Sequence, residues 1–182
     1  MKTHRLVIAI LFSGCCVMSG CTQDKLPTAP YIPTPPQLAT GSGVLTANID
    51  GLSWAAADIA GVPSGTSTYS GNILHIWGAR AVVGDTAEAE TINLIIDLSA
   101  SKAYIVPGRY SLGTIPAQAG EAQHNDGLMC VCRTNSTHSG TATITTLDVA
   151  RKVVSGTFEF TGIGVDGQTH NFGDGMFDVA WK

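Results

Sequence analysis

The chain has 182 residues, of which 13% are charged, and its 10 Lys and Arg residues stand against 14 Asp and Glu for a formal net charge of −4. Without the first 20 residues, which contain Lys2 and Arg5, 8 basic residues stand against 14 acidic ones and the charge is −6. This charge does not favour nucleic acid or an anionic lipid surface as a partner, and the 21 glycines suit a β-rich exported domain better than a helical one.

The chain begins with a basic segment and a short apolar run. The basic residues Lys2 and Arg5 lie within the first five residues of the chain. The apolar run extends over residues 6–18 and is interrupted only by Ser13 and Gly14. A membrane-spanning helix needs about 20 apolar residues, so this run of 13 residues is too short to span a bilayer. The pattern predicts a secretory signal peptide over residues 1–20.

The motif MSGC at residues 18–21 resembles the bacterial lipobox, in which an apolar residue and two small residues precede a Cys that becomes lipidated. The resemblance implies cleavage before Cys21 and acyl chains, such as palmitate, on that residue. The motif FSGC at residues 12–15 is the alternative. It fits less well, because it leaves a shorter apolar segment and Cys16 and Val17 would follow the lipidated Cys15, whereas the polar sequence TQDKLP follows Cys21.

The residue after Cys21 bears on localisation. Lipoproteins of this class that carry Asp there tend to stay in the inner membrane, and this chain has Thr22. The resemblance therefore implies a lipid-anchored protein of the bacterial cell envelope, in the outer membrane. Whether the domain faces the periplasm or the exterior stays open.

Residues 21–40 form a Pro-rich segment after the lipidated Cys, with five of the eight prolines of the chain. Such a segment forms neither a helix nor the centre of a sheet. Extended as polyproline II, the 19 residues 22–40 reach roughly 60 Å. We expect a tether that holds a single domain, residues 41–182, away from the bilayer.

The domain shows the period-2 alternation of half-buried strands. The runs that show it are residues 43–49, 53–59, 72–81, 91–99, 140–147, 153–162 and 175–182, whereas residues 127–134 are apolar on both faces at their centre. Asp50-Gly51 predicts a tight hairpin, and Asp-Gly pairs separate several of the other runs. The pattern predicts an all-β fold, a single antiparallel β-sandwich of about nine strands, with a closed, calycin-like β-barrel as the alternative.

The alternation also assigns side chains to the core. The inward-facing side chains are expected to be Ile92, Leu94, Ile96, Leu98, Val154, Phe158, Phe160, Phe177, Val179 and Trp181. Trp54 and Trp77 are expected to pack in the core or at its rim.

Four segments carry a family resemblance: VLTANIDGLSWAAA, PGRYSLG, SGTATITTLDVARKVVSGTFEFTG and GMFDVAWK. Over most of residues 43–182 they resemble small bacterial outer-membrane lipoproteins built on a β-rich domain of unknown function. The matching positions are Gly51, Trp54, Gly108, Tyr110, Gly140, Asp148, Gly156, Phe158, Phe160 and Phe177. These are turn and core positions, so the resemblance implies a fold and a location but no activity.

The segment MCVC departs from that pattern. Cys130 and Cys132 are two residues apart, so in a strand they face the same side. In an oxidising compartment they are expected to form a disulfide or another oxidised pair. Two free thiols, or a soft-metal site completed by His138, are the alternatives.

Acidic residues near the end of the chain suggest a candidate calcium site. Asp166, Asp174 and Asp178 lie in or after a Gly-rich loop, and calcium takes six to eight oxygen ligands. Asp-Gly is also ordinary turn chemistry, and the two readings stay open. Glu90 is expected to be solvated in a loop.

No catalytic constellation emerges from the sequence, and no cofactor is expected. The function expected is therefore that of a non-catalytic binding or interaction β-domain on a membrane-anchored lipoprotein, with a protein, glycan or small molecule as its partner. A calycin-like carrier of an apolar small molecule and a metal-assisted envelope enzyme are the alternatives.

Overall fold

A computed structural model of the chain describes residues 39–57, 65–82, 85–113, 120–126 and 131–182. The chain divides into two units, Met1–Thr34 and Pro35–Lys182, and every described residue belongs to the second. The signal peptide, Cys21 and the tether up to residue 38 lie outside the described residues and stay predictions. Within the described ranges, no helix is both long enough and apolar enough to cross a membrane.

The described regular structure is almost entirely strand. It consists of β1 (Val44–Ile49), β2 (Leu52–Ala55), β3 (Gly65–Tyr69), β4 (Ile73–Val82), β5 (Asp85–Asp97), a 3₁₀ helix η1 (Ser99–Ser101), β6 (Gly108–Leu112), β7 (Gly120–Asn125), β8 (Val131–Arg133), β9 (Gly140–Asp148), β10 (Val153–Ile163) and β11 (Thr169–Ala180). The predicted all-β class is therefore confirmed.

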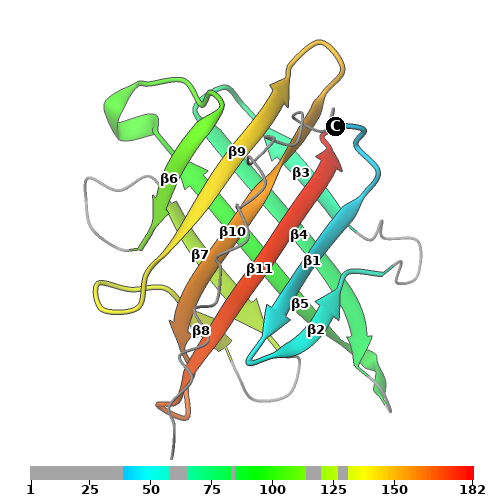
Figure 1. The fold of residues 1–182 in the computed structure, drawn as a ribbon, viewed down its shortest axis with the longest axis vertical. Helices are drawn as coiled ribbons and strands as arrows, with labels where there is room; N and C mark the ends of the chain where they lie inside the picture. The colour runs from blue at the N-terminus through cyan, green and yellow to red at the C-terminus, as the bar shows by residue number, and fades with distance from the viewer. Residues whose placement is uncertain (1–38, 58–64, 83–84, 114–119, 127–130) are drawn as a thin grey trace, which may run out of the picture. The chain divides into compact units, whose positions relative to one another are not determined.

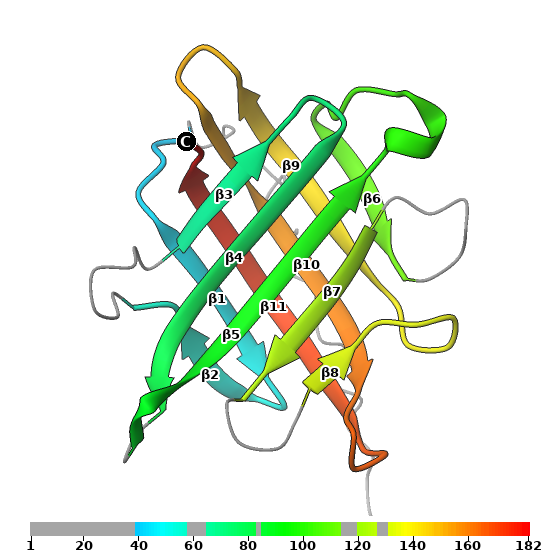
Figure 2. The same cartoon turned by 180° about the vertical axis from the view of Figure 1, so that it is seen from behind.

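All the strands belong to one antiparallel sheet. Its main path runs in the order β2-β1-β11-β10-β8-β7-β5-β4-β3, and β9 pairs with β10 and carries β6 on its other side. The sheet is curled into a half-barrel, in which the strands of one half cross behind those of the other (Figure 1, Figure 2). In place of the two separate sheets of a sandwich, a single sheet thus supplies both facing halves.

The continuity depends on a short strand at one end of β10. Ile163, the last residue of β10, pairs with Arg133 of β8, and β8 in turn pairs with β7. At the open margin, the hydroxyl of Ser67 on β3 donates a hydrogen bond to the Ala180 carbonyl of β11 at 3.2 Å. One margin of the sheet, β3, therefore approaches the end of β11, which is the third strand from the other margin.

The space between the two halves is filled by one hydrophobic cluster. The predicted inward-facing residues are buried: Ile92, Leu94, Ile96, Val154, Phe158, Phe160, Phe177, Val179 and Trp181, with Leu98 partly buried at the margin. Trp54 is 2% exposed and belongs to the same cluster. Because burial of apolar surface is the main favourable term in folding, this cluster stabilises the half-barrel.

The predicted hairpin at Asp50 and Gly51 is present. Ile49 pairs with Leu52, which leaves a two-residue turn, and Asp50 and Gly51 have φ angles of 51° and 84°. Positive φ at both central residues is the requirement of the tight turn that matches the twist of a hairpin. This turn folds β2 back along β1 and so positions one wall of the candidate site.

Candidate functional site

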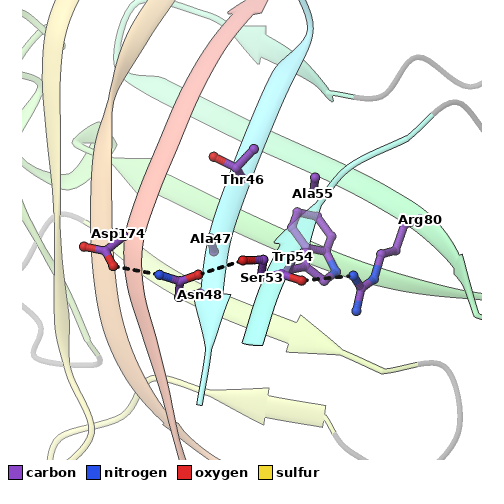
Figure 3. A pocket seen from close by; sticks show the side chains of 8 residues that line it. All are labelled: Thr46, Ala47, Asn48, Ser53, Trp54, Ala55, Arg80 and Asp174. Carbon is purple, nitrogen blue, oxygen red and sulfur yellow. Dashed lines mark hydrogen bonds between the residues drawn. The ribbon is translucent and has the colours of Figure 1, made fainter. Parts of the chain in front are cut away.

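The candidate site is an open cleft of about 420 Å³ beside β2, which we call the β2 cleft (Figure 3). Side chains from four strands meet there, because the β1–β2 hairpin places β2 between β1 and β4. The cleft is lined by Thr46, Ala47, Asn48, Ser53, Trp54, Ala55, Arg80 and Asp174.

A β-bulge brings Asp174 to the cleft. Thr46 of β1 pairs with Met176 of β11, but Asn48 pairs with Gly173, so β11 contains one extra residue between these pairs. Asp174 lies in this interval and has a φ of 49°. A bulge bends its strand and re-aims a side chain, and here it directs the carboxylate toward β1.

The polar side chains of the cleft form a chain of hydrogen bonds. Asn48 Nδ2 donates to Asp174 Oδ2 at 2.7 Å, and the Ser53 hydroxyl donates to Asn48 Oδ1 at 3.4 Å (Figure 3). Arg80 Nη1 reaches the carbonyl oxygen of Ser53 at 3.5 Å. The cleft therefore presents a carboxylate, an amide, a hydroxyl and a guanidinium along one line.

Behind the cleft, Arg80 also belongs to a cluster of polar side chains with Glu90 and His124. Arg80 Nε donates to Glu90 Oε2 at 2.5 Å, and His124 Nε2 lies 2.9 Å from Glu90 Oε1. Glu90 is only 13% exposed, so the expectation of a solvated loop was wrong. The strand register explains the contact, because Arg80 pairs with Glu90 across β4 and β5 and both side chains face inward.

The partners of Glu90 keep it ionised. Burial opposes the charged form, but the hydrogen bonds from His124 and Arg80, together with their charges, outweigh burial and lower the pKa of Glu90 below its ordinary value. Because an ionised carboxylate only accepts hydrogen bonds, Nε2 of His124 carries the proton in this contact.

Two buried nitrogen atoms next to this group have no hydrogen-bond partner among the described residues. They are Nε1 of Trp54 and Nδ1 of His124. The Arg80 guanidinium lies 5.9 Å from the centre of the Trp54 ring, and the His124 ring lies 5.1 Å from that of Phe172. Aromatic rings thus pack against two of the polar groups, Arg80 at the cleft and His124 behind it.

A second open cleft, of about 510 Å³, adjoins the first on the outer face of β9, β10 and β11, and we call it the β10 groove. One row of paired residues crosses the five neighbouring strands β1, β11, β10, β9 and β6: Thr46, Met176, Thr157, Thr143 and Arg109. All of these except Thr46 line the groove. Asp174 lines both clefts. Together they form one surface that mixes polar and apolar side chains, with Met176, 53% exposed, near its middle.

The cysteine prediction is only partly within the described residues. Cys132 on β8 is fully buried and takes part in a disulfide. Cys130 lies outside the described residues, so its pairing with Cys132 stays a prediction.

His138 lies apart from Cys132 in its contacts. Its ring contacts Asn135, Thr137 and Thr169, with Nε2 3.0 Å from the Thr169 hydroxyl. Among the described residues, no three His, Cys, Asp or Glu side chains are arranged to hold a metal ion. Because Cys130 lies outside these residues, the metal alternative at Cys130, Cys132 and His138 stays a prediction.

The three candidate calcium ligands have separate partners. Asp166 accepts the backbone N–H of Gln168 in the β10–β11 hairpin, and Asp174 accepts from Asn48. Asp178 accepts from the residues that precede β1. The structure thus gives each carboxylate a protein partner, and the calcium reading stays a prediction.

Sequence reasoning identified Asp174 but missed Asn48, Ser53 and Arg80. The hairpin at residues 50–51 was a usable signal, since it sets Asn48 opposite Ser53. Nothing in the sequence pairs Arg80 with β2, because that contact joins strands that are not neighbours in the sheet.

Comparison with known proteins gives a family but no function. The family model described as "Domain of unknown function (DUF6252)" matches residues 42–179. No curated protein and no solved structure matches the chain.

Proposed function

We propose that this chain, which belongs to the DUF6252 family, is a lipoprotein of the bacterial cell envelope whose β-domain binds a ligand without catalysing a reaction. The lipid anchor is proposed at Cys21, and the β2 cleft is proposed as the binding site. The observation that carries the binding role is the line of polar side chains from Asp174 through Asn48 and Ser53.

The lining of the cleft supports binding rather than catalysis. Among its lining residues, Asp174 accepts a hydrogen bond from Asn48 and the Ser53 hydroxyl donates to Asn48, so this carboxylate and this hydroxyl are not paired as a base and a nucleophile would be. Hydrogen bonds link Asp174, Asn48 and Ser53, and Arg80 is held by Glu90 and the Ser53 carbonyl. These side chains therefore lose little conformational entropy when a polar ligand binds. The continuous hydrophobic cluster between the two halves favours a surface site over a carrier of an apolar molecule.

The anchor is tested by labelling with an alkyne-bearing fatty acid in a bacterial host. The full chain and the Cys15→Ser variant are expected to incorporate the label, whereas Cys21→Ser is not. Mass spectrometry of the mature protein is expected to find acyl chains on an N-terminal Cys21. Label that depends on Cys15, or an unlabelled wild-type chain, would contradict the anchor at Cys21.

The binding role is tested with purified envelope components, namely peptidoglycan fragments, lipopolysaccharide and phospholipid. Each is passed over immobilised full-length protein and over the Asn48→Ala/Asp174→Ala double variant. Retention by the wild type that the double variant loses would support the β2 cleft as a binding site. Equal retention by both proteins would rule out that cleft, and a chemically altered component in the eluate would rule out a non-catalytic role.

A further inference from the structure

One end of the half-barrel brings together three connections, and we call it the tether end. It comprises residues 70–72 between β3 and β4, residues 98–107 between β5 and β6, residues 149–152 between β9 and β10, and the two chain segments 39–43 and 181–182. Figures 1 and 2 show the connections and the end of β11 on the same, upper side of the half-barrel.

The chain that leads from Cys21 joins the domain at this end. Ala39 is 1% exposed, and the backbone N–H groups of Thr40 and Gly41 donate to the Asp178 carboxylate. Gly41 packs so closely on Val153, just after the β9–β10 hairpin, that a Cβ atom there would lie 2.7 Å from Val153 Cγ1. The end of the predicted tether is thus fixed beside that hairpin.

The tether end is also where the cations gather. Four of the seven Lys and Arg residues in the described part of the chain lie there, and all four are exposed: Lys102, Arg151, Lys152 and Lys182. Three acidic residues, Asp97, Asp148 and Asp178, lie at the same end, where each accepts a backbone hydrogen bond, so four cations stand against three carboxylates.

At the opposite end of the half-barrel, acidic side chains outnumber basic ones. Asp50, Asp126 and Asp166 lie in its turns, with Arg133 as the exposed cation nearby. The net negative charge of the chain therefore hides a charge difference between the two ends, which the sequence total does not reveal.

Exposed apolar side chains accompany the cations. Tyr104 is 76% exposed and Val106 57% exposed in the β5–β6 connection, and Val149 is 60% exposed at the tip of the β9–β10 hairpin. Tyrosine suits a boundary where one side is apolar and the other wet. Exposed apolar side chains also occur at the opposite end, where Leu52 is 75% and Val165 is 74% exposed. The two ends therefore differ in their cations and not in their exposed apolar side chains.

We propose that the tether end docks the domain on the anionic phospholipid headgroups of the membrane that holds its anchor. The proposal rests on the proposed anchor at Cys21 for its choice of membrane. Each Lys or Arg near an anionic surface strengthens attachment by about fivefold, and loop-tip Tyr and Val side chains add apolar contact at the headgroup boundary. Because a tether makes docking intramolecular, even a weak surface is expected to be occupied.

The proposal is tested by photo-cross-linking of the full mature protein reconstituted in vesicles. Benzoylphenylalanine replaces Val149 in one sample and Val165 in another, since both are exposed valines at hairpin tips, at opposite ends of the half-barrel. On vesicles that contain phosphatidylglycerol, the yield of phospholipid adducts is expected to be at least fivefold higher at Val149. Equal yields, or a higher yield at Val165, would overturn the proposal.

Two charge-reversal variants test whether the cations attract the lipid or whether Val149 is merely held near the membrane by the tether. Arg151→Glu/Lys152→Glu is expected to lower the adduct yield at Val149 about fivefold or more. Arg109→Glu/Arg133→Glu, which makes the same change in net charge away from the tether end, is expected to leave the yield within twofold. An equal fall in both variants would contradict docking through the tether end, as would an adduct of Val149 with a protein in intact envelopes.

Failure of the anchor remains distinguishable from failure of the docking surface. The intact mass of each sample shows whether Cys21 is acylated, and an unacylated chain contradicts the proposed function. The ratio of adducts at Val149 and Val165 is then measured with added vesicles at low salt, and it still decides whether the tether end contacts lipid.

Discussion

The carboxylate of Asp178, on the last strand, accepts hydrogen bonds from both the backbone N–H and the hydroxyl of Thr40, which lies 138 residues earlier in the chain. The N–H of Gly41 and the hydroxyl of Ser42 donate to the same carboxylate. Burial disfavours the charged form, yet these donors outweigh it and lower the pKa of Asp178 below its ordinary value. One ionised side chain thus fixes the start of the domain against its last strand.

We predict that Asp178→Ala lowers the free energy of unfolding by about 2 kcal/mol, because hydrogen bonds to a charged group contribute about 1.5–3 kcal/mol. Chemical denaturation at pH 7 measures the change. Glu121→Ala removes an equal charge from an exposed position on β7 and is expected to change stability by less than about 0.5 kcal/mol. A similar loss in both variants would show that net charge, and not the contact with Thr40, is responsible.

Gly156 provides a prediction about packing between strands. A Cβ atom at this position would lie 2.1 Å from the carbonyl oxygen of Thr143 and 2.5 Å from Cζ of Phe177. Since the first of these contacts is with backbone, Gly156→Ala is expected to cost about 3 kcal/mol or more. Thermal unfolding measures the effect.

Gly173 is the matched control for that substitution. It lies on β11, and an added Cβ atom there would meet nothing within 4 Å. Gly173→Ala is therefore expected to stay within about 1 kcal/mol of the wild type. If Gly156→Ala proved as mild as Gly173→Ala, the close approach of β9 and β10 at Thr143 would be wrong.

Strands with strongly apolar inner faces could be predicted from the sequence, and others could not. In β5, Ile92, Leu94 and Ile96 are at most 1% exposed and alternate with the more exposed Asn93, Ile95 and Asp97. In β7, the inward positions are Ala122 and His124, both buried, and neither gives a hydrophobic alternation. The period-2 signal depends on large apolar side chains, so a strand with small or polar inner residues has none.

The same limit explains why the strand β3 was not expected from the sequence. Gly65 and Ser67 face inward, and the Ser67 hydroxyl is satisfied by the Ala180 carbonyl at the far end of the chain. A pairing between segments 113 residues apart is a consequence of the curled sheet. The local sequence carries no trace of it.

The candidate site was harder to predict for the same reason. Asp174 could be singled out, since Asp174-Gly175 is a turn-like pair, but calcium was one interpretation of it. Its contact with Asn48 depends on a bulge in β11, and the sequence does not fix where an extra residue falls in a ladder. Likewise, Glu90 becomes part of a partly buried ion pair only because of its register with Arg80.

The localisation proposal yields a sorting prediction at the residue after the proposed lipidated Cys. If Cys21 is acylated, Thr22→Asp is expected to move most of the protein from the outer to the inner membrane fraction of a density gradient. Thr22→Asn, polar but uncharged, is expected to leave it in the outer membrane fraction. Wild-type protein in the inner membrane fraction would contradict delivery to the outer membrane.

The partly buried pair of Glu90 and Arg80 predicts a pH-dependent stability difference. Glu90→Gln is expected to lower the free energy of unfolding at pH 7 by about 2 kcal/mol. This is less than the roughly 3–5 kcal/mol for a fully buried pair, because Arg80 is 38% exposed and water screens the interaction. Urea unfolding of the wild type and the variant measures the difference.

The sign of the pH dependence follows from the lowered pKa of Glu90. In the unfolded chain the pKa of a Glu side chain is about 4.3, and in the folded protein that of Glu90 is lower. Its stabilising contribution is therefore complete above the unfolded value and is lost as the pH falls through the folded value. The difference in free energy of unfolding between the wild type and Glu90→Gln should be constant from pH 7 to about pH 5 and should narrow below pH 4.

The control is Glu159→Gln, at an exposed position on β10, which should differ little from the wild type in free energy of unfolding at any pH. A gap for Glu90→Gln that persisted unchanged to pH 3 would mean that shape, and not the charge shared with Arg80 and His124, accounts for the loss.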